Sequence, residues 1–376
     1  MKITFVAPRF HTNQHFWVKT LQERGHEVTF LVDRKAEVAE HYETIEPIVV
    51  ETHKLPKILC ILIDLFMKVQ GKLPRERLHT VPQWKFLKNH LAGINAADIV
   101  IVRDVGSTLS LTTFLICKLN KIPCILYTQH PLEDREKTPT RFLQLIGLAP
   151  KYRITPIRKN TSHTYNESTK AFYVPLISDF NFKISEQNYS NPPLKVLFIG
   201  KFGLRRKNPL LLLKAINLLK RDGFVLQVTL IGYANQSNPL LQEIMTYINN
   251  NDLGSVVTIK RNITFKEITN EYKAHDIFVL PSINEPFSVS TLEAMSHALP
   301  VIISDTNGSK YCVQHNKTGY VVQSNSVGDL RDHLEQFLIN QDKVKEMGTA
   351  ANQYIKKEHS PEVFYDYFFN ALDKVI

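Results

Sequence analysis

Two glutamates in the C-terminal half of the sequence could hold one ligand at two points. Glu285 and Glu293 stand eight positions apart, in the segment Asn284-Glu285-Pro286-Phe287-Ser288-Val289-Ser290-Thr291-Leu292-Glu293. An apolar run at 276–280 precedes them and another at 299–304 follows, which predicts strand, loop, helix and strand. Glu285 would then follow the carboxyl end of a strand, where open α/β sheets bind ligands, and Glu293 would lie on the next helix. This spacing indicates an elongated, polyhydroxylated ligand.

A glycine followed by several cations could bind an anion upstream of these acids. The apolar strand predicted at 194–200 ends in Gly200 and continues as Lys201-Phe202-Gly203-Leu204-Arg205-Arg206-Lys207-Asn208. Asn208 as N-cap and Pro209 at the first helical position predict a helix start beside these cations, which is a favourable place for an anion. Each feature alone has an ordinary alternative: a solvated basic loop, a helix-surface acid for Glu293 and a helix-start acid for Glu285.

The elements that would position these residues form two α/β domains. Short apolar segments predict strands at 1–8, 26–32, 98–103, 123–128 and 171–175, and again at 194–200, 225–232, 256–260, 276–281, 301–304 and 319–322. Helical segments separate many of them, which predicts parallel sheets with right-handed crossovers. We predict an N-terminal domain at 1–180, a polar linker at 181–193 and a C-terminal domain at 194–358. The tail at 359–376 is predicted to be a helix that could pack back on the N-terminal domain.

Composition indicates an ordinary globular protein of 376 residues, with 43% hydrophobic and 22% charged residues. The sequence contains no run of eighteen uncharged apolar residues, so a membrane-spanning helix is not predicted. The first residues predict a strand rather than a signal peptide. The four cysteines are widely spaced, which favours a reducing compartment over a zinc site or a disulfide scaffold. We therefore expect a cytoplasmic protein.

A strongly basic segment at 54–88 indicates a polyanionic partner. The net charge is +10, and this segment alone holds eight basic and two acidic residues, among them Lys72, Arg75 and Arg77. Its apolar run at 55–69 lies between cations, as in helices that rest on anionic bilayers. We expect docking on the inner face of the cytoplasmic membrane; a core helix with a solvated basic edge is the alternative. Nucleic acid is not expected, because no RNP-type motif accompanies the cations.

Taken together, these motifs resemble those of the retaining nucleotide-sugar glycosyltransferases of family four, within glycosyl transferases group 1. The resemblance is carried by Gly200-Lys201, Lys207-Asn208, Glu285-Pro286-Phe287, Leu292-Glu293-Ala294-Met295 and Leu299-Pro300-Val301-Ile302-Ile303-Ser304 with Asn307-Gly308. The block at 276–322 is the specific part, and weaker matches extend over residues 1–325. The resemblance implies the GT-B fold, an α/β architecture of two Rossmann-like, doubly wound parallel-sheet domains that face a central cleft.

The same resemblance implies a role for each matching residue. Lys201 and Lys207 would hold the donor diphosphate, Glu285 would contact the transferred sugar, and Glu293 would bind the ribose hydroxyls. His130 would reach the donor sugar from the N-terminal domain; a buried histidine at a strand end is the alternative. We thus expect Glu285, His130 and Lys207 to be catalytic, and the substrate-binding set to be Gly200, Lys201, Arg205, Lys207, Phe287, Ser288, Val289 and Glu293.

The implied chemistry requires neither a cofactor nor a metal. Departure of a nucleoside diphosphate adds negative charge, and the chain contains no Asp-x-Asp motif, so the lysines and a helix N-terminus would stabilise that charge. The resemblance implies retention of configuration, with attack on the face from which the diphosphate leaves, and Glu285 is not expected to be a nucleophile. The donor would be of the UDP or GDP type. The acceptor would be a glycan or a lipid-linked glycan in surface polysaccharide or glycoconjugate biosynthesis.

Departures from the family pattern indicate a divergent member. The first loop, at 9–15, contains no glycine, Ser288 replaces a common glycine, and Tyr311 stands where glutamate is usual. Two alternative functions stay open: another GT-B enzyme, such as a phosphorylase or a sugar-nucleotide epimerase, and a non-catalytic protein that binds sugar nucleotides.

Overall fold

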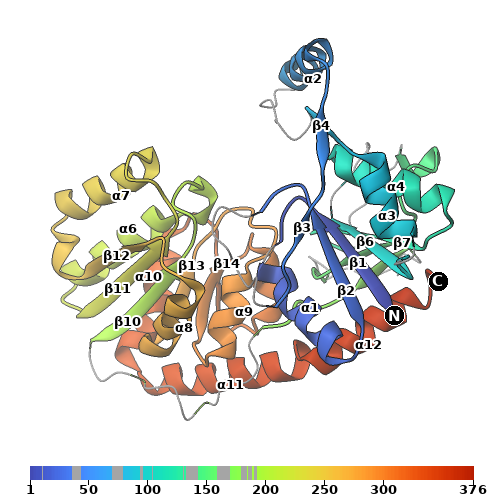
Figure 1. Cartoon of the computed structure of the whole chain (residues 1–376). Helices are drawn as coiled ribbons and strands as arrows, with labels where there is room; N and C mark the ends of the chain where they lie inside the picture. Colours follow the sequence, from blue (N-terminus) through green and yellow to red (C-terminus); the bar gives the residue numbers. More distant parts are fainter. Residues whose placement is uncertain are drawn as a thin grey trace. The chain divides into compact units, whose positions relative to one another are not determined.

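The alternating strands and helices form two parallel sheets in the computed structural model, each in its own compact unit (Figure 1). The structure describes residues 1–10, 12–35, 44–69, 79–93, 96–103, 105–129, 131–132, 143–158, 170–178, 184, 189 and 193–376. The first unit comprises Met1–Ile177 with Pro361–Ile376, and the second comprises Ser178–Ser360. The chain therefore passes from one unit to the other twice, at 177–178 and at 360–361.

The first unit contains a seven-stranded parallel sheet with the order β3-β2-β1-β6-β7-β8-β9. Its strands are β1 (Lys2–Ala7), β2 (Glu27–Val32), β3 (Ile48–Val49), β6 (Ile99–Arg103), β7 (Cys124–Tyr127), β8 (Arg153–Thr155) and β9 (Ala171–Tyr173). The central strands read as continuous apolar runs, such as Ile99-Val100-Ile101-Val102, and these residues are buried. Such runs are typical of parallel strands covered on both faces.

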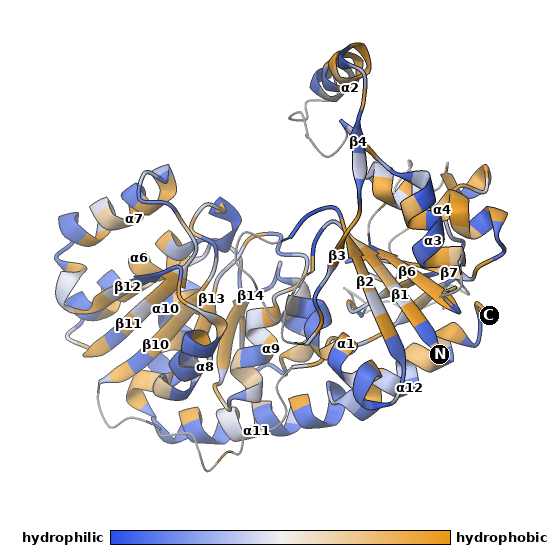
Figure 2. Ribbon diagram, in the orientation of Figure 1, coloured by the Kyte–Doolittle hydropathy of each residue, from blue (hydrophilic) through white to orange (hydrophobic). Residues whose placement is uncertain are grey.

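Helices bury the apolar faces of this sheet. They are α1 (Thr12–Glu23), α3 (Trp84–Ala92) and α4 (Thr108–Leu119). Leu87 and Leu91 of α3 join Phe114 of α4 in a buried cluster with the strand residues Val6, Leu31, Val100, Val102 and Leu126. The side chain of Ser107 caps α4 by accepting a hydrogen bond from the amide of Ser110 at 3.1 Å. Figure 2 shows the hydrophobic residues concentrated in the strands of both sheets.

The last helix of the chain, α12 (Pro361–Leu372), belongs to the first unit and packs on α1. The buried indole of Trp17 stacks on the ring of Phe364, with 5.3 Å between ring centroids. Its Nε1 donates a hydrogen bond to the carbonyl of Pro175 at 2.8 Å. At the surface, Arg24 pairs with Glu362 at 3.5 Å. An aromatic core contact and a surface ion pair thus fix α12 to the unit that contains β1.

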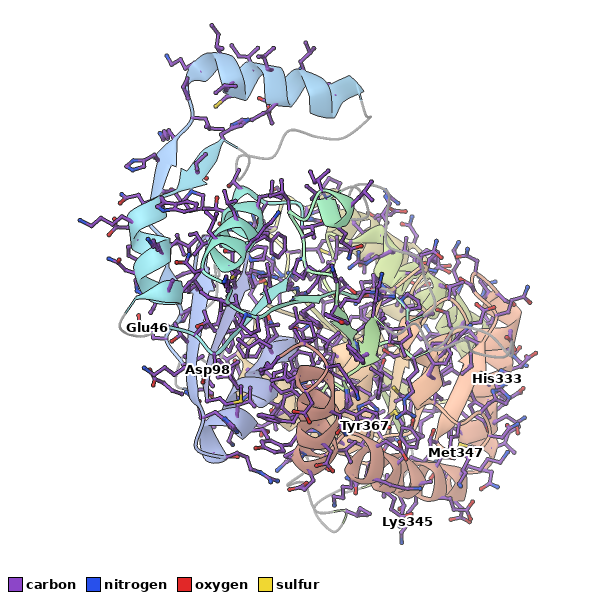
Figure 3. The ribbon with its side chains drawn as sticks, turned by 90° about the vertical axis from the view of Figure 1, so that its right-hand side faces the viewer. Glu46, Asp98, His333, Lys345, Met347 and Tyr367 are labelled. Carbon is purple, nitrogen blue, oxygen red and sulfur yellow. The ribbon has the colours of Figure 1, made fainter. Side chains whose placement is uncertain are left out.

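A two-stranded antiparallel ribbon extends from the first unit and carries helix α2 (Lys57–Val69). β4 (Thr52–Lys54) pairs with β5 (Thr80–Pro82), and α2 lies between them in the sequence. Figures 1 and 3, which differ by a 90° turn, both show α2 at the end of the ribbon that is remote from the seven-stranded sheet. The ribbon was not predicted, because strands of three residues carry too little alternation to be recognised.

The second unit contains a six-stranded parallel sheet with the order β12-β11-β10-β13-β14-β15. Its strands are β10 (Leu194–Ile199), β11 (Leu226–Gly232), β12 (Val257–Arg261), β13 (Ile277–Leu280), β14 (Val301–Ser304) and β15 (Gly319–Val322). Its helices are α6 (Pro209–Arg221), α7 (Pro239–Asn250), α8 (Phe265–Ala274), α9 (Val289–Ser296), α10 (Val327–Ile339) and α11 (Asp342–Glu358). The order of strands reverses at β10, which has β11 on one side and β13 on the other.

The predicted fold class is confirmed: both units are Rossmann-like, with parallel sheets and helical crossovers. One local expectation is met in position only. Asn208 occupies the N-cap position and Pro209 begins α6, but the Asn208 side chain makes no capping hydrogen bond. Asn208 adopts the left-handed conformation, at φ 55°, and its side-chain amide donates to Asn325 Oδ1 at 3.3 Å. The same residue also ends the preceding 3₁₀ turn, Arg205–Lys207. Most of the predicted linker at 181–193 lies outside the described residues.

Candidate functional site

The candidate site lies at the carboxyl edge of the six-stranded sheet, where the strand order reverses. β10 and β13 are neighbours, and both run toward this edge, which in α/β sheets of this kind is the place where ligands bind. The loop after β10 contains Gly200 and Lys207, and the loop after β13 contains Glu285. A backbone hydrogen bond from the amide of Ile283 to the carbonyl of Arg206, at 2.7 Å, joins the two loops.

Glu285 is the central charged group of the site. It is 5% exposed, and its Oε2 accepts from Lys207 Nζ at 3.0 Å and from Arg206 Nε at 3.2 Å. A buried carboxylate is costly without such partners, and here two cations meet on a single oxygen. The three side chains together carry a formal charge of +1, so the cluster can compensate further negative charge brought by a ligand.

Glycines allow these two loops to approach each other and their neighbours. A β-carbon at Gly200 would lie 3.1 Å from the Phe198 ring and 3.2 Å from the Lys207 side chain, so a larger residue there would crowd both. On the other side, the amide of Gly308 donates to the carbonyl of Glu285 at 2.8 Å, and a β-carbon at Gly308 would collide with the backbone of Pro286. The positions of Lys207 and Glu285 therefore depend on small residues next to them.

The N-terminus of α9 follows Glu285 directly and points into the same edge. Ser288 Oγ accepts from the amide of Thr291 at 3.2 Å, which caps the helix. Ser309 Oγ accepts from the amide of Ser288 at 2.7 Å and donates to its carbonyl at 3.1 Å. The hydroxyl of Thr291 is buried and makes no hydrogen bond in the structure. This capped start places backbone amides and the positive end of a helix dipole beside the Arg206–Lys207 pair.

Glu293 lies on α9 and is held by a tyrosine. The hydroxyl of Tyr272, near the end of α8, donates to Glu293 Oε2 at 2.8 Å, and the Tyr272 ring stacks on His297 at 5.2 Å. Tyr272 is 1% exposed. Burial raises the pKa of Tyr272 well above its ordinary value, and the charge of Glu293 raises it further, so the phenol keeps its proton and remains a donor. Tyr272 was not singled out from the sequence, because no motif marks it.

The structure separates the two adjacent arginines of the loop. Arg205 was predicted to bind substrate, yet its guanidinium pairs with Glu243 of α7 at 3.1 Å and its side chain is 75% exposed. Arg206, which was not predicted, takes the position beside Glu285. Gly200, Lys201 and Lys207 lie in the loop after β10, and Phe287, Ser288, Val289 and Glu293 lie around the start of α9, as the sequence predicted. The Phe287 side chain is buried, and His130 lies outside the described residues.

A second polar cluster lies at the carboxyl edge of the seven-stranded sheet. Arg103 ends β6, Tyr127 ends β7, and Asn13 lies in the first turn of α1. Arg103 donates to Asn13 Oδ1 at 3.1 Å and to Gln129 Oε1 at 3.4 Å, and Asn13 donates to the hydroxyl of Tyr127 at 3.2 Å. The Oε1 atom of the neighbouring Gln14 is buried without a hydrogen bond. The glycine-free first loop therefore leads into a set of amides, a cation and a phenol.

The described residues contain neither a metal-binding cluster nor a membrane-spanning helix. Among them, no three histidine, cysteine, aspartate or glutamate side chains lie close enough together to hold a metal ion. Within the same residues, no helix has both the length and the apolarity needed to cross a membrane.

Comparison with known proteins agrees with the geometry of the second unit. Residues 179–354 match the family described as Glycosyl transferases group 1. The D-inositol 3-phosphate glycosyltransferase of Nocardia farcinica is 28% identical over 163 residues, which are 42% of this chain and 35% of that protein. The amylovoran biosynthesis glycosyltransferase AmsK of Erwinia amylovora is 25% identical over 202 residues, 52% of this chain and 48% of that protein. The chain thus spans between a third and a half of the length of these relatives.

Similarity to solved structures extends over the whole chain. HepE of Anabaena, whose structure was determined in complex with UDP and glucose, has a TM-score of 0.71 at 14% sequence identity, and the match covers 99% of both chains. At this identity the likeness establishes the fold alone. The chain therefore has the two-domain GT-B fold of these structures, and its residues 179–354 resemble the glycosyl transferases group 1 family.

Proposed function

We propose that the protein is a retaining, metal-independent glycosyltransferase that moves a sugar from a nucleoside diphosphate to a glycan or lipid-linked glycan. One observation supports this most directly: Lys207 and Arg206 meet on a single oxygen of the buried Glu285, beside the N-terminus of α9. That cluster offers positive charge for a leaving diphosphate and a carboxylate for sugar hydroxyls.

The reaction proposed at this cluster needs only side chains and backbone of the chain. The bond between the anomeric carbon and the diphosphate oxygen breaks, and the acceptor hydroxyl attacks from the same face and gives its proton to the departing oxygen. Lys201, Lys207 and Arg206 stabilise the charge that develops on the diphosphate, together with the dipole of α9. Glu285 orients the transferred sugar and forms no covalent intermediate.

Donor recognition is proposed to extend from Glu285 to Glu293. Glu293 binds the ribose hydroxyls, and Tyr272 keeps its carboxylate in place through the 2.8 Å hydrogen bond. A donor of the UDP or GDP type is proposed; the similarity to HepE, whose structure contains UDP, supports the former. His130 keeps its proposed role of reaching the donor sugar from the first unit.

The acceptor is proposed to meet the first unit. The cluster of Asn13, Arg103 and Tyr127 offers amide, guanidinium and phenol groups that suit a hydroxylated or anionic acceptor. One relative acts in amylovoran biosynthesis according to its name, which supports a role in the biosynthesis of surface polysaccharides or glycoconjugates. We propose that the enzyme works in the cytoplasm, at the inner face of the membrane.

The test is turnover of a panel of nucleotide sugars by the purified protein, with the products analysed by NMR. We expect one donor to be consumed equally well with magnesium and with EDTA, and the product to keep the donor's anomeric configuration. Glu285→Gln and Arg206→Ala should each lower kcat by roughly a hundred-fold, as when one charge-stabilising group is removed from an active site.

Arg205→Ala is the matched control, because that arginine is the neighbour of Arg206 but pairs with Glu243. Its kcat should stay within about two-fold of the wild-type value, since an exposed ion pair contributes little. Nucleotide binding without turnover in the wild-type protein would indicate a sugar-nucleotide-binding protein. Release of the sugar as its 1-phosphate, with phosphate as the acceptor, would indicate a phosphorylase. Either result would refute the proposal.

A further inference from the structure

The outer face of helix α2 is apolar and exposed, which glycosyl transfer in the second unit does not explain. The residues Ile58, Ile61, Leu62 and Leu65 are 72%, 63%, 56% and 58% exposed. Their spacing of three, four and seven residues from the first places them on one side of a helix, where they form a continuous stripe. Leu59, which is 43% exposed, widens the stripe. Figure 2 shows hydrophobic stretches along α2, away from the sheet of the first unit.

The opposite face of α2 is attached to the ribbon, which fixes the direction of the stripe. Asp64 Oδ1 pairs with Nε2 of His79 at 2.8 Å, just before β5. The thiol of Cys60 donates to the carbonyl of Leu55 at 3.6 Å, between β4 and the helix. The amide of Leu55 donates to the carbonyl of His79 at 2.8 Å, so both attachment points belong to the end of the ribbon. The apolar stripe therefore faces away from the ribbon.

Lysines border the stripe on one side. Lys57 and Lys68 are exposed and eleven residues apart, which is three helical turns, so they lie on the same line along α2, next to Ile61. The exposed Lys54 ends β4 nearby. Asp64 is the acid of this helix, and its carboxylate is paired with His79. The accessible surface formed by the described side chains of α2 is thus apolar with a basic border.

We infer that α2 is a membrane-docking helix that lies in the surface of an anionic phospholipid bilayer. The stripe enters the boundary between headgroups and acyl chains, and the lysines extend to the headgroup phosphates. The positive border matches the negative surface of such a bilayer. With 13 residues, α2 is too short to span the bilayer, and at the end of the ribbon it lies away from the sheet of the first unit.

Docking also bears on the acceptor. A transferase held at a bilayer by α2 meets acceptors that are anchored in the same bilayer, so the inference selects the lipid-linked acceptor from the two proposed classes. This selection rests on the proposed glycosyl transfer, whereas the docking itself depends only on the surface of α2. The two can therefore be tested separately.

The experiment measures co-sedimentation of the full chain with vesicles of phosphatidylcholine mixed with phosphatidylglycerol, and with vesicles of phosphatidylcholine alone. The wild-type chain should bind the anionic vesicles, and Ile61→Asn/Leu62→Asn should bind them at least roughly ten-fold more weakly. The affinity of Lys57→Gln/Lys68→Gln for anionic vesicles should fall about five-fold per lysine, and its affinity for neutral vesicles should change little. Val225→Asn/Ile339→Asn is the matched control, because these residues of the second unit are 69% and 68% exposed.

Equal binding of the wild-type chain, the α2 variants and the control would refute the inference. A second result would also refute it: the wild-type chain does not bind vesicles but forms a concentration-dependent dimer in sedimentation velocity, and Ile61→Asn/Leu62→Asn abolishes that dimer. A second copy of the chain would then cover the stripe. Ile58→Trp places a tryptophan in the stripe. The tryptophan fluorescence of this variant should shift to shorter wavelength when anionic vesicles are added. Nucleotide binding by the same variants, measured without vesicles, should equal that of the wild-type chain, which separates a failure of docking from a failure of the proposed function.

Discussion

At the scale of single residues, the loop after β10 shows how neighbours in sequence acquire different roles. Arg205, Arg206 and Lys207 form one 3₁₀ turn, in which successive side chains are about 120° apart. In this turn Arg206 and Lys207 both reach Glu285, while Arg205 reaches Glu243. The motif spacing in the sequence placed Lys207 and Glu285 in the loops after two strands and Glu293 on the following helix, and the structure agrees with these positions. The spacing could not show which of Arg205 and Arg206 contacts Glu285, because the direction of each side chain depends on where the turn begins.

Tyr272→Phe tests whether the tyrosine positions Glu293. The change removes one hydrogen bond to a carboxylate, worth about 1.5–3 kcal/mol, and leaves the stacking on His297 in place. We expect the KM for the donor to rise roughly ten-fold and kcat to change less than about three-fold, because the ribose lies away from the reacting bond.

The control for this prediction is a 2′-deoxynucleotide, which lacks one of the hydroxyls that Glu293 would bind. Binding of nucleoside diphosphate and of its 2′-deoxy form, measured by calorimetry, should differ less in Tyr272→Phe than in the wild-type protein. An equal difference in both would mean that Tyr272 supports the fold only.

At the scale of elements, the length of a segment decided how well it could be predicted. The helix predicted at 361–372 and the strand predicted at 301–304 agree with α12 and β14, because each carries a clear apolar pattern. β8 and the β4–β5 ribbon are three residues long in each strand, and they form only because neighbouring strands provide hydrogen bonds. The apolar run at 55–69 was recognised, but no pattern within it reveals whether a partner covers it.

The junction between α8 and β13 makes a prediction about pH. His275 is buried there, its Nδ1 donates to the carbonyl of Glu271 at 2.7 Å, and its Nε2 accepts from Thr229 at 2.8 Å. Burial lowers the pKa of His275 below its ordinary value of 6.5, and this outweighs the opposing effects of Glu271 and Asp276, while Lys260 adds to the lowering. The unfolded chain therefore takes up the proton first as the pH falls.

The contribution of neutral His275 to the free energy of unfolding is complete above about pH 6.5, the pKa of histidine in the unfolded chain. This contribution decreases as the pH falls from that value toward the lower pKa of His275 in the folded protein. Urea unfolding at about pH 7.5 and about pH 5.5 would measure the change, which for one proton is at most about 1.4 kcal/mol per pH unit. His275→Gln should weaken this dependence. The same slope in the variant and the wild-type protein would assign the effect to other groups.

At the scale of the whole molecule, α12 completes the first unit although the second unit separates it from the rest of that unit in the sequence. Phe364→Ala removes the ring that stacks on Trp17 and should lower the stability of the first unit by about 3–5 kcal/mol. In calorimetry, one transition should move to lower temperature, while the nucleotide binding proposed for the second unit is retained. Ile376→Ala, at a residue that is 66% exposed, should change neither the transition temperatures nor nucleotide binding. A shift of both transitions in Phe364→Ala would show that the units unfold together.

The double passage of the chain also sets an order for biosynthesis. Ser178–Ser360 forms a contiguous stretch, so the ribosome translates this entire unit before it translates α12. During that interval, the indole of Trp17 lacks the ring of Phe364 that stacks on it in the folded unit. Since domains commonly fold as units, the first unit, whose residues emerge earliest, is completed only when α12 follows the second unit.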